Sequence, residues 1–384
     1  MSCGDFPIYH SLFFQKCAII SIMVSSIREI GENIKNSPLF IGDINYDVPM
    51  SEHTTMKVGG SAPIFIEPEN EISLAQAVST LKSQGIQVFV LGGGSNTVVR
   101  DGEMQRAVIS MSRLNAISIE SKNAAPFEIE DFPEVKEAAE ITLTAGAGVT
   151  IEALNAWCVK YGILGFETFA GLPGTVGGAT FMNARCYGTD FSTNITEIKY
   201  LDLDRIPASL EKYSEYDLKY SLDDRSFISV YTKDESNSGT DWGYKQSPMQ
   251  KKNAVILSVK FALRGIDLYV TAGQSASPRI SDYIWKKNAE KIADRTEKGQ
   301  FKAPSAGSVF KNNRDYGKPS GAIIDELGMK GTKIGGAQVA PWHGNFIINM
   351  GNATADDVEK LVNFVMEKVS ENTGYNLEPE IIFV

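Results

Sequence analysis

The chain has 384 residues, 43% hydrophobic and 22% charged, which are the length and composition of a globular protein with two or three domains. Its net charge of −10 argues against a general nucleic-acid binder, which would carry a basic face. The four cysteines and three histidines include no CxxC pair and no HExxH motif, so we expect a reducing compartment, the cytoplasm, and no metal site.

The first 25 residues form an apolar segment that we expect to be a disordered leader. The stretch "SLFFQKCAIISIMVSS" is interrupted by Gln15 and Lys16, which makes it a poor signal peptide. A leader or a mis-called start, with Met23 as the true first residue, fits better than a signal peptide. The segment is too short and too broken to span a membrane, so no membrane partner is expected.

The N-terminal half alternates between strands and helices. A short helix is expected over residues 26–34, then a strand in "APIFIEP", a helix in "EISLAQAVSTLKSQGI" that Gly85 ends, and a strand in "VFVLG". The last three segments predict one βαβ unit. A second unit begins with a strand in "EITLTAGAGV" and continues with a helix that Thr150 caps and Gly162 ends.

The C-terminal half contains a clear strand, "AVILSVKFAL", and a Ser- and Pro-rich segment after Gly265 that indicates a domain boundary. Its best helix is "TADDVEKLVNFVMEKVSENTG", where Thr354 and Asp357 stand at the two positions of a capping box. We therefore expect a separate domain at residues 266–384.

The stretch "VFVLGGGSNTVV" suggests an anion site built from main-chain amides. Glycines let a backbone approach a ligand closely, and successive exposed N–H groups form a concave site that suits a diphosphate. The alternative is a tight turn with an Asx motif. The loop is neither a P-loop nor a GxGxxG motif that opens a helix, because β-branched, strand-like residues follow it.

Two further loops rich in small residues support a ligand. "GLPGTVGGATFMNA" is dense in glycine and stiffened by Pro173, and "TTMKVGG" precedes the first βαβ unit. Three such loops in the first half predict one large ligand that several backbone segments touch. A flat dinucleotide such as FAD fits that description.

Eight motifs in sequence order resemble the UDP-N-acetylenolpyruvoylglucosamine reductase (MurB) family. From about Phe40 to the C-terminus, the chain contains "TTMKVGG", "VLGGGSNTVV", "AGAGVTIEALNAWC", "GLPGTVGGATFMNARCYG", "WGYKQS", "SAGSVFKNN", "IDELGMKGTKIGGAQV" and "LEPEIIF". The resemblance implies an α+β fold with an FAD-binding part of the vanillyl-alcohol-oxidase/PCMH type, made of two α/β subdomains at residues 26–87 and 88–265. It also implies that residues 266–384 form an α/β substrate-binding domain whose C-terminal segment returns to the active site.

The resemblance also implies the reaction and the cofactors. NADPH gives a hydride to FAD, the hydride passes to C3 of the enolpyruvyl ether of UDP-N-acetylglucosamine, and a proton is added at C2. The residues expected to hold FAD are Gly59, Leu91, Gly92, Gly93, Gly94, Ser95, Asn96, Gly171, Pro173, Gly174, Thr175, Gly177, Gly178 and Ala179.

Three residues are candidates for catalysis. Ser308 in "AGSVF" matches the family serine that protonates C2, although alone it would suggest only a turn. Glu380 in "LEPE" matches the family glutamate that stabilises the enolate, and its apolar neighbours favour a neutral carboxyl. Lys245 in "WGYKQS" stands where the family has arginine, which keeps the charge but loses the planar fork. Arg225 is the alternative source of that guanidinium.

Expected substrate contacts follow the same motifs, in a type of the family without the extra tyrosine loop. They are Tyr244, Lys311, Asn312, Lys330, His343 and Asn345. We expect a monomer that acts on a small nucleotide sugar. The rival hypotheses are another FAD-dependent oxidoreductase of the same superfamily and a nucleotide-sugar binding protein with reduced activity.

Overall fold

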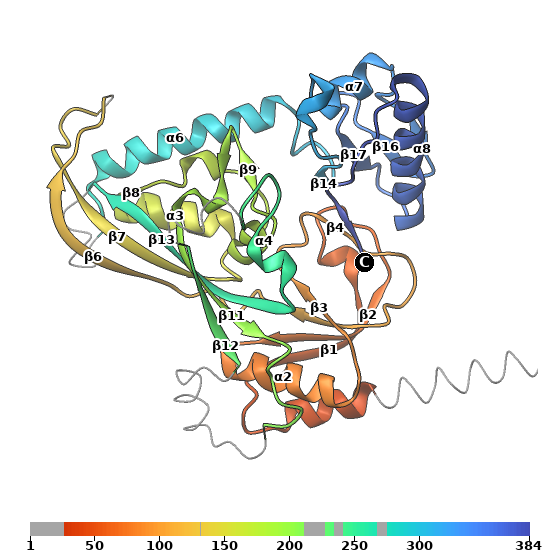
Figure 1. Ribbon diagram of the computed structural model, residues 1–384, viewed down its shortest axis with the longest axis horizontal. Coiled ribbons are helices and arrows are strands. Elements are labelled where there is room, and N and C mark those ends of the chain that lie inside the picture. Colours follow the sequence, from red (N-terminus) through yellow and green to blue (C-terminus); the bar gives the residue numbers. More distant parts are fainter. Residues whose placement is uncertain (1–26, 131, 211–226, 234–240, 267–274) are drawn as a thin grey trace, which may run out of the picture.

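The first region of the chain is a four-stranded sheet with two helices packed against it. The computed structural model describes residues 27–130, 132–210, 227–233, 241–266 and 275–384, so the expected leader and Arg225 lie outside the described residues (Figure 1). Residues 27–35 are helical, as the sequence predicts. The sheet has the order β1-β2-β5-β3. Its elements are β1 (Gly42–Pro49), β2 (Ser61–Pro68), α2 (Glu71–Ser83), β3 (Val88–Leu91) and β5 (Ala107–Ser110).

The βαβ unit in this region differs from the expectation in one respect. Strands β2 and β3 are both parallel to β5, which lies between them and hydrogen-bonds to each. The sheet therefore continues to Ser110, and a boundary between residues 87 and 88 would cut it. Two parallel strands joined by a helix stay in one sheet, but a single sequence gives no local sign of the strand that inserts between them.

The second region is a larger antiparallel sheet with helices packed against it. Its strand order is β12-β11-β13-β7-β6, with β8 paired to the end of β13. Thr150 caps α3 through its side chain, and Gly162 ends it at φ 69°, as expected. The elements are β6 (Ile117–Pro126), β7 (Glu137–Gly146), α3 (Ile151–Tyr161), β8 (Ile163–Leu164), α4 (Val176–Phe181), β11 (Ile195–Asp202), β12 (Ile228–Thr232) and β13 (Ala254–Gly265).

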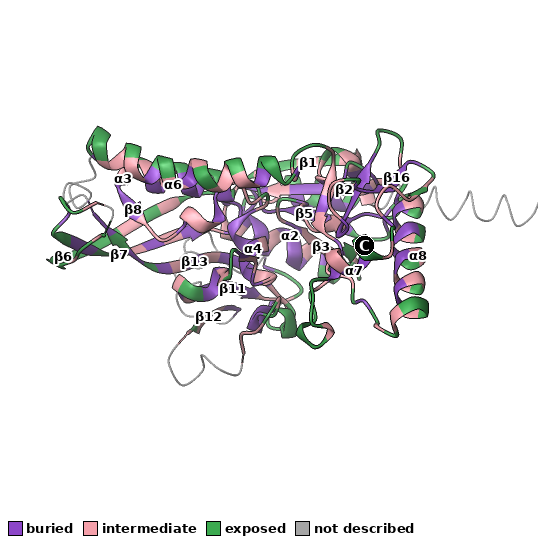
Figure 2. Cartoon of the chain, turned by 90° about the horizontal axis from the view of Figure 1, so that it is seen from above, coloured by how far each residue is buried: buried purple, intermediate pink, exposed green. Residues whose placement is uncertain are grey.

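Helix α6 (Pro278–Glu297) is an element that the sequence analysis did not assign. It packs on α3 and therefore belongs with the second region, although it follows the boundary expected after Gly265. Only Ile284, Asn288 and Arg295 on this helix are buried, and its other side is exposed (Figure 2). So few buried positions over 20 residues leave little periodicity for a sequence pattern to show.

The third region is a small antiparallel sheet with two helices. Its order is β14-β17-β16-β15. Helix α8 has the expected capping box between Thr354 and Asp357, and its apolar stripe is buried. Its elements are β14 (Ser305–Ser308), α7 (Ser320–Glu326), β15 (Lys333–Ile334), β16 (Ala337–Val339), β17 (Phe346–Asn349) and α8 (Ala355–Thr373).

The C-terminal strand returns to the first region. β18 (Ile382–Phe383) pairs in parallel with β4 (Thr97–Val98), directly after the GGGSN loop. The backbone N–H of Ile382 donates to the carbonyl of Asn96 at 2.9 Å. This pairing brings residues near position 380 beside a loop almost 300 positions earlier.

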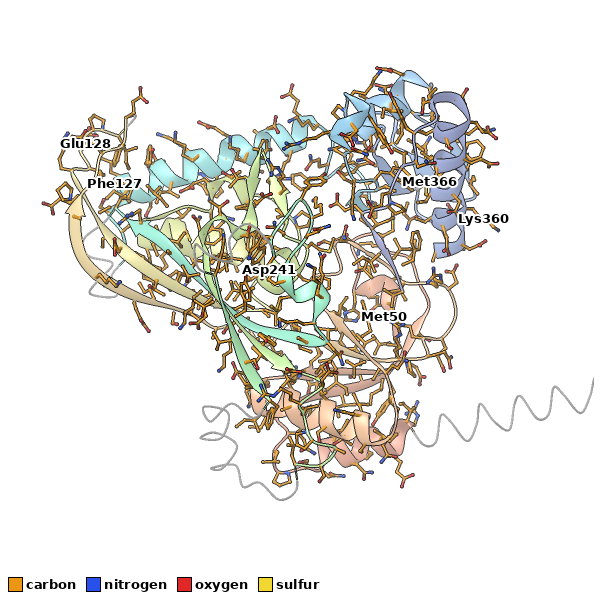
Figure 3. All side chains as sticks on the ribbon, viewed as in Figure 1. Met50, Phe127, Glu128, Asp241, Lys360 and Met366 are labelled. Atoms are coloured by element: carbon orange, nitrogen blue, oxygen red, sulfur yellow. The ribbon has the colours of Figure 1, made fainter. Side chains whose placement is uncertain are left out.

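The far end of the second sheet lies away from the third region. Phe127 and Glu128 lie at the end of the β6–β7 hairpin, opposite α8 with Lys360 and Met366 (Figure 3). Among the described helices, none is long and apolar enough to cross a membrane. Nor do the described residues include a group of three or more His, Cys, Asp or Glu placed to hold a metal ion.

Candidate active site

The three glycine-containing loops meet in the structure. A Cβ on Gly93 would lie 2.6 Å from the Cα of Gly174, so the GGGSN and GLPG loops touch through their backbones. Ser95 Oγ donates to the carbonyl of Pro173 at 3.1 Å. The third loop joins them where the N–H of Thr55 donates to the carbonyl of Gly94 at 3.1 Å. A side chain on Gly93 or Gly94 would keep the loops apart, so these glycines are required for loop packing as well as for any ligand.

The loops line a cavity of about 1140 Å³. That volume exceeds the roughly 300–1,000 Å³ of cavities that hold drug-sized ligands, so it suits a dinucleotide. The cavity wall includes all the residues expected to hold FAD except two: Gly59 packs on Val99, and Gly171 packs against Arg295. A Cβ on Gly178 would find only Thr175 Oγ1 within 4 Å, which leaves that backbone open.

A second cavity, of about 770 Å³, adjoins the first. Its wall includes the expected substrate residues Tyr244, Lys311 and Asn312. Both cavities share one stretch of wall, and the three candidate catalytic residues lie on it. The residues that line both cavities are Arg185, Tyr187, Lys245, Ser308 and Glu380.

Lys245 and Glu380 form an ion pair on this shared wall. Lys245 Nζ lies 2.6 Å from Glu380 Oε1, and only 13% and 10% of the two side chains are exposed. The Glu380 carboxyl thus meets a cation rather than the wholly apolar surroundings expected from its sequence neighbours. The arrangement brings two of the three candidate catalytic residues into direct contact.

The backbone of Lys245 is strained. Its φ is +57°, a region that costs a residue with a side chain about 1–3 kcal/mol. The strain sits in a tight turn where Gly243 and Gln246 exchange two backbone hydrogen bonds of 3.1 and 3.0 Å. The turn points the Lys245 side chain at Glu380, so the strained conformation serves the ion pair.

Glu380 is held from both sides through its main chain. Its N–H donates to the carbonyl of Val309 at 2.7 Å, next to Ser308, and its carbonyl accepts from Asn96 Nδ2 at 3.0 Å. The Asn96 side chain, expected to face FAD, thus ties the GGGSN loop to the C-terminal segment. Ser308 ends β14 opposite Phe346, so the third region presents Ser308 and Glu380 together.

Three of the expected substrate residues line neither cavity. Lys330 pairs with Asp325 at 2.8 Å. Asn345 is buried, and its amide donates to and accepts from the backbone of Phe310, so it positions β14 instead of facing a ligand. His343 Nδ1 accepts from the N–H of Asn345 at 3.1 Å, and burial lowers the pKa of His343.

Several cavity residues were missed by the sequence reasoning. Arg185 and Tyr187 lie in the quoted motif "MNARCYG", which was interpreted only through its glycines. Tyr187 Oη donates to Asp294 Oδ2 at 2.7 Å, and partial burial with this hydrogen bond raises the pKa of Tyr187 to about 12. The remaining missed residues of the second cavity include Gln246, Asn313, Arg314, Tyr316, Asn376 and Glu378.

Comparisons with known proteins identify the family of this chain. A family model described as the UDP-N-acetylenolpyruvoylglucosamine reductase C-terminal domain matches residues 299–384, and a model of an FAD binding domain matches residues 62–204. The UDP-N-acetylenolpyruvoylglucosamine reductase of Treponema denticola is 38% identical and covers 91% of this chain and 96% of its own. The one from Borrelia garinii subsp. bavariensis is 30% identical, covering 94% and 98%.

A solved structure supports the fold independently. The MurB of Thermus caldophilus aligns with a TM-score of 0.60 at 23% identity, over 90% of this chain and 99% of its own. The expected α+β fold with an FAD-binding domain is confirmed by these matches. Because its relatives match over nearly their whole length, the chain belongs to the UDP-N-acetylenolpyruvoylglucosamine reductase (MurB) family.

Proposed function

We propose that this chain reduces UDP-N-acetylglucosamine enolpyruvate to UDP-N-acetylmuramate with NADPH and FAD, a step of peptidoglycan precursor synthesis. The observation that carries the proposal is the wall shared by the two cavities, where Lys245, Ser308 and Glu380 lie together. One cavity has the size and the glycine-lined wall for FAD. The adjoining cavity has Arg314 and Lys311 on its wall, cations suited to a nucleotide diphosphate, although Lys311 pairs with Glu378 of the same wall.

The residues present fit FAD. The open backbone at Gly178 and the three converging loops make a cradle that a side chain would fill. Leu91 to Asn96 and Pro173 to Ala179 would hold the cofactor, and bound FAD supplies hydride exchange between NADPH and the enolpyruvyl group. Thr55 keeps this cradle against the third region, because its Oγ1 donates to the carbonyl of Ser305 at 2.7 Å.

The chain's own residues handle the proton and the developing charge. When a hydride reaches C3, the electron pair of the double bond moves toward C2 and its carboxylate, and C2 then takes a proton. Ser308 Oγ is the proton donor in this proposal, and Lys245 with Glu380 orients and stabilises the enolate. A monomer is the proposed active form.

The cytoplasm is the proposed location. Cys158 and Cys186 are buried and unpaired, which suits a reducing compartment. Burial also raises the pKa of the Cys158 thiol, so it stays protonated and unreactive.

An anaerobic two-step assay tests the function. NADPH should bleach the flavin absorbance of the purified holoprotein, and the enolpyruvyl nucleotide sugar should then restore it without oxygen. Restoration by oxygen alone would favour an oxidase of the same superfamily. A protein that binds the sugar but carries no reducible flavin would favour a binding protein.

A further inference from the structure

The wall between the two cavities carries an unassigned guanidinium. Among the described residues, the cations that line both cavities are Lys245 and Arg185. Lys245 is a point charge already engaged by Glu380 at 2.6 Å. Arg185 is therefore the cation on this wall with the planar, forked donors that match a carboxylate.

Arg185 is anchored but keeps donors for a ligand. It lies on β9 (Arg185–Cys186), opposite Asp190 of β10 (Thr189–Asp190). Its Nη1 donates to both Asp190 carboxylate oxygens at 3.0 Å. Nε and Nη2 make no hydrogen bond within the described part of the chain. Asp190 lines neither cavity, so one side of the guanidinium is fixed and the rest faces the shared wall.

Asn183 fixes Arg185 relative to Lys245. Asn183 Nδ2 donates to the carbonyl of Gly243, at the start of the turn that carries Lys245, at 2.8 Å. Its Oδ1 accepts from the N–H of Ser192, just past β10, at 3.1 Å. This buried amide therefore joins the two segments that supply the cations. Such fixed donors cost little further ordering when a ligand binds.

We propose that Arg185 binds the carboxylate of the substrate, held in place by Asp190. The inference rests on the proposed function: the carboxylate is attached to C2, the atom that Ser308 protonates, so it must lie on the same stretch of wall. Both cations on this wall have a carboxylate partner. Arg185 differs from Lys245 in keeping forked donors beside the position where the carboxylate gains negative charge.

Two ligands that differ in the carboxylate test the proposal. Calorimetric titration of the FAD-loaded protein would compare UDP-N-acetylmuramate, which has the carboxylate, with UDP-N-acetylglucosamine, which lacks it. Arg185→Gln should weaken the first by about 10- to 100-fold, the range for hydrogen bonds to a charged group, and leave the second within about twofold. Arg185→Lys should lose affinity for the first ligand less than Arg185→Gln does, because it keeps charge without the fork.

The control is Arg264→Gln, which removes another paired arginine that lines neither cavity. It should leave both affinities unchanged. Equal losses for both ligands in Arg185→Gln would mean contact with the sugar or diphosphate and would overturn the proposal, as would unchanged binding of both.

Asp190→Asn tests whether Asp190 positions the Arg185 guanidinium or only stabilises the fold. It should weaken only the carboxylate-bearing ligand, by less than Arg185→Gln does, because the guanidinium is retained but less well held. Loss of both ligands there would contradict the positioning role. Failure of the unsubstituted holoprotein in the two-step flavin assay would instead contradict the proposed function, so the two failures remain distinct.

Discussion

The Lys245–Glu380 pair gives a quantitative prediction about stability. Lys245→Met leaves a carboxylate that is only 10% exposed without its ammonium. Removing one member of a fully buried pair costs about 3–5 kcal/mol, whereas an exposed pair contributes about 0–1. Because a tenth of each side chain still reaches solvent, we expect Lys245→Met to lower the free energy of unfolding by about 2–4 kcal/mol.

A double-mutant cycle isolates the pair itself. Glu380→Gln should cost about 1–2 kcal/mol, because the amide oxygen can still accept from the ammonium. The combined variant leaves no unpaired charge, so its loss should fall short of the sum by about 1–3 kcal/mol. Urea denaturation of all four proteins at the same saturating FAD concentration measures these differences. Additive losses, within about 0.5 kcal/mol, would show that the contact is not a coupled ion pair.

Three further predictions concern proton transfer, the cofactor cradle and pH. Ser308→Ala should keep flavin reduction by NADPH but slow reoxidation by the enolpyruvyl substrate by about 10²- to 10⁴-fold in stopped flow, and normal reoxidation would remove Ser308 from its role. Gly93→Ala should destabilise the protein even without FAD, because the added Cβ would lie 2.6 Å from the Cα of Gly174. Gly178→Ala should mainly weaken FAD binding, because its Cβ meets no backbone. Equal changes in the melting temperature of the two FAD-free variants would contradict this. Burial lowers the pKa of His343 below 6.5, so the unfolded state takes up a proton more readily than the folded state. The contribution of His343 to the free energy of unfolding is therefore fully present above pH 6.5 and is lost as the pH falls below it. His343→Gln should reduce the loss of stability at acid pH in urea titrations, and an unchanged pH dependence would refute the prediction.

The features that the sequence predicted well are those set by local chemistry. The Thr354–Asp357 capping box and the Thr150 cap with Gly162 each involve residues a few positions apart, so their geometry follows from spacing alone. The glycine loops were also recognisable, because few other roles need so many small residues together. Motif order then pointed to Ser308 and Glu380, which the structure places on one wall.

What the sequence did not show depends on contacts between distant segments. Strand β5 enters between β2 and β3, which moves the end of the first sheet beyond the expected boundary. Asn345 was expected to contact the substrate, yet both ends of its side-chain amide hydrogen-bond to the backbone of Phe310, 35 positions away. Arg185 was overlooked because nothing in its own motif shows that β9 faces the turn carrying Lys245.

The hydrogen bond from Asn96 to the carbonyl of Glu380 also makes cofactor binding and tail docking reciprocal. If FAD orders the loop that contains Asn96, it stabilises the pairing of β18 with β4. By linkage, that pairing must increase the affinity for FAD by the same coupling free energy. Carboxypeptidase should then trim residues 382–384 more slowly as FAD saturates the protein, and the trimmed protein should release FAD faster. In that case the segment that carries Glu380 would also slow the release of the flavin.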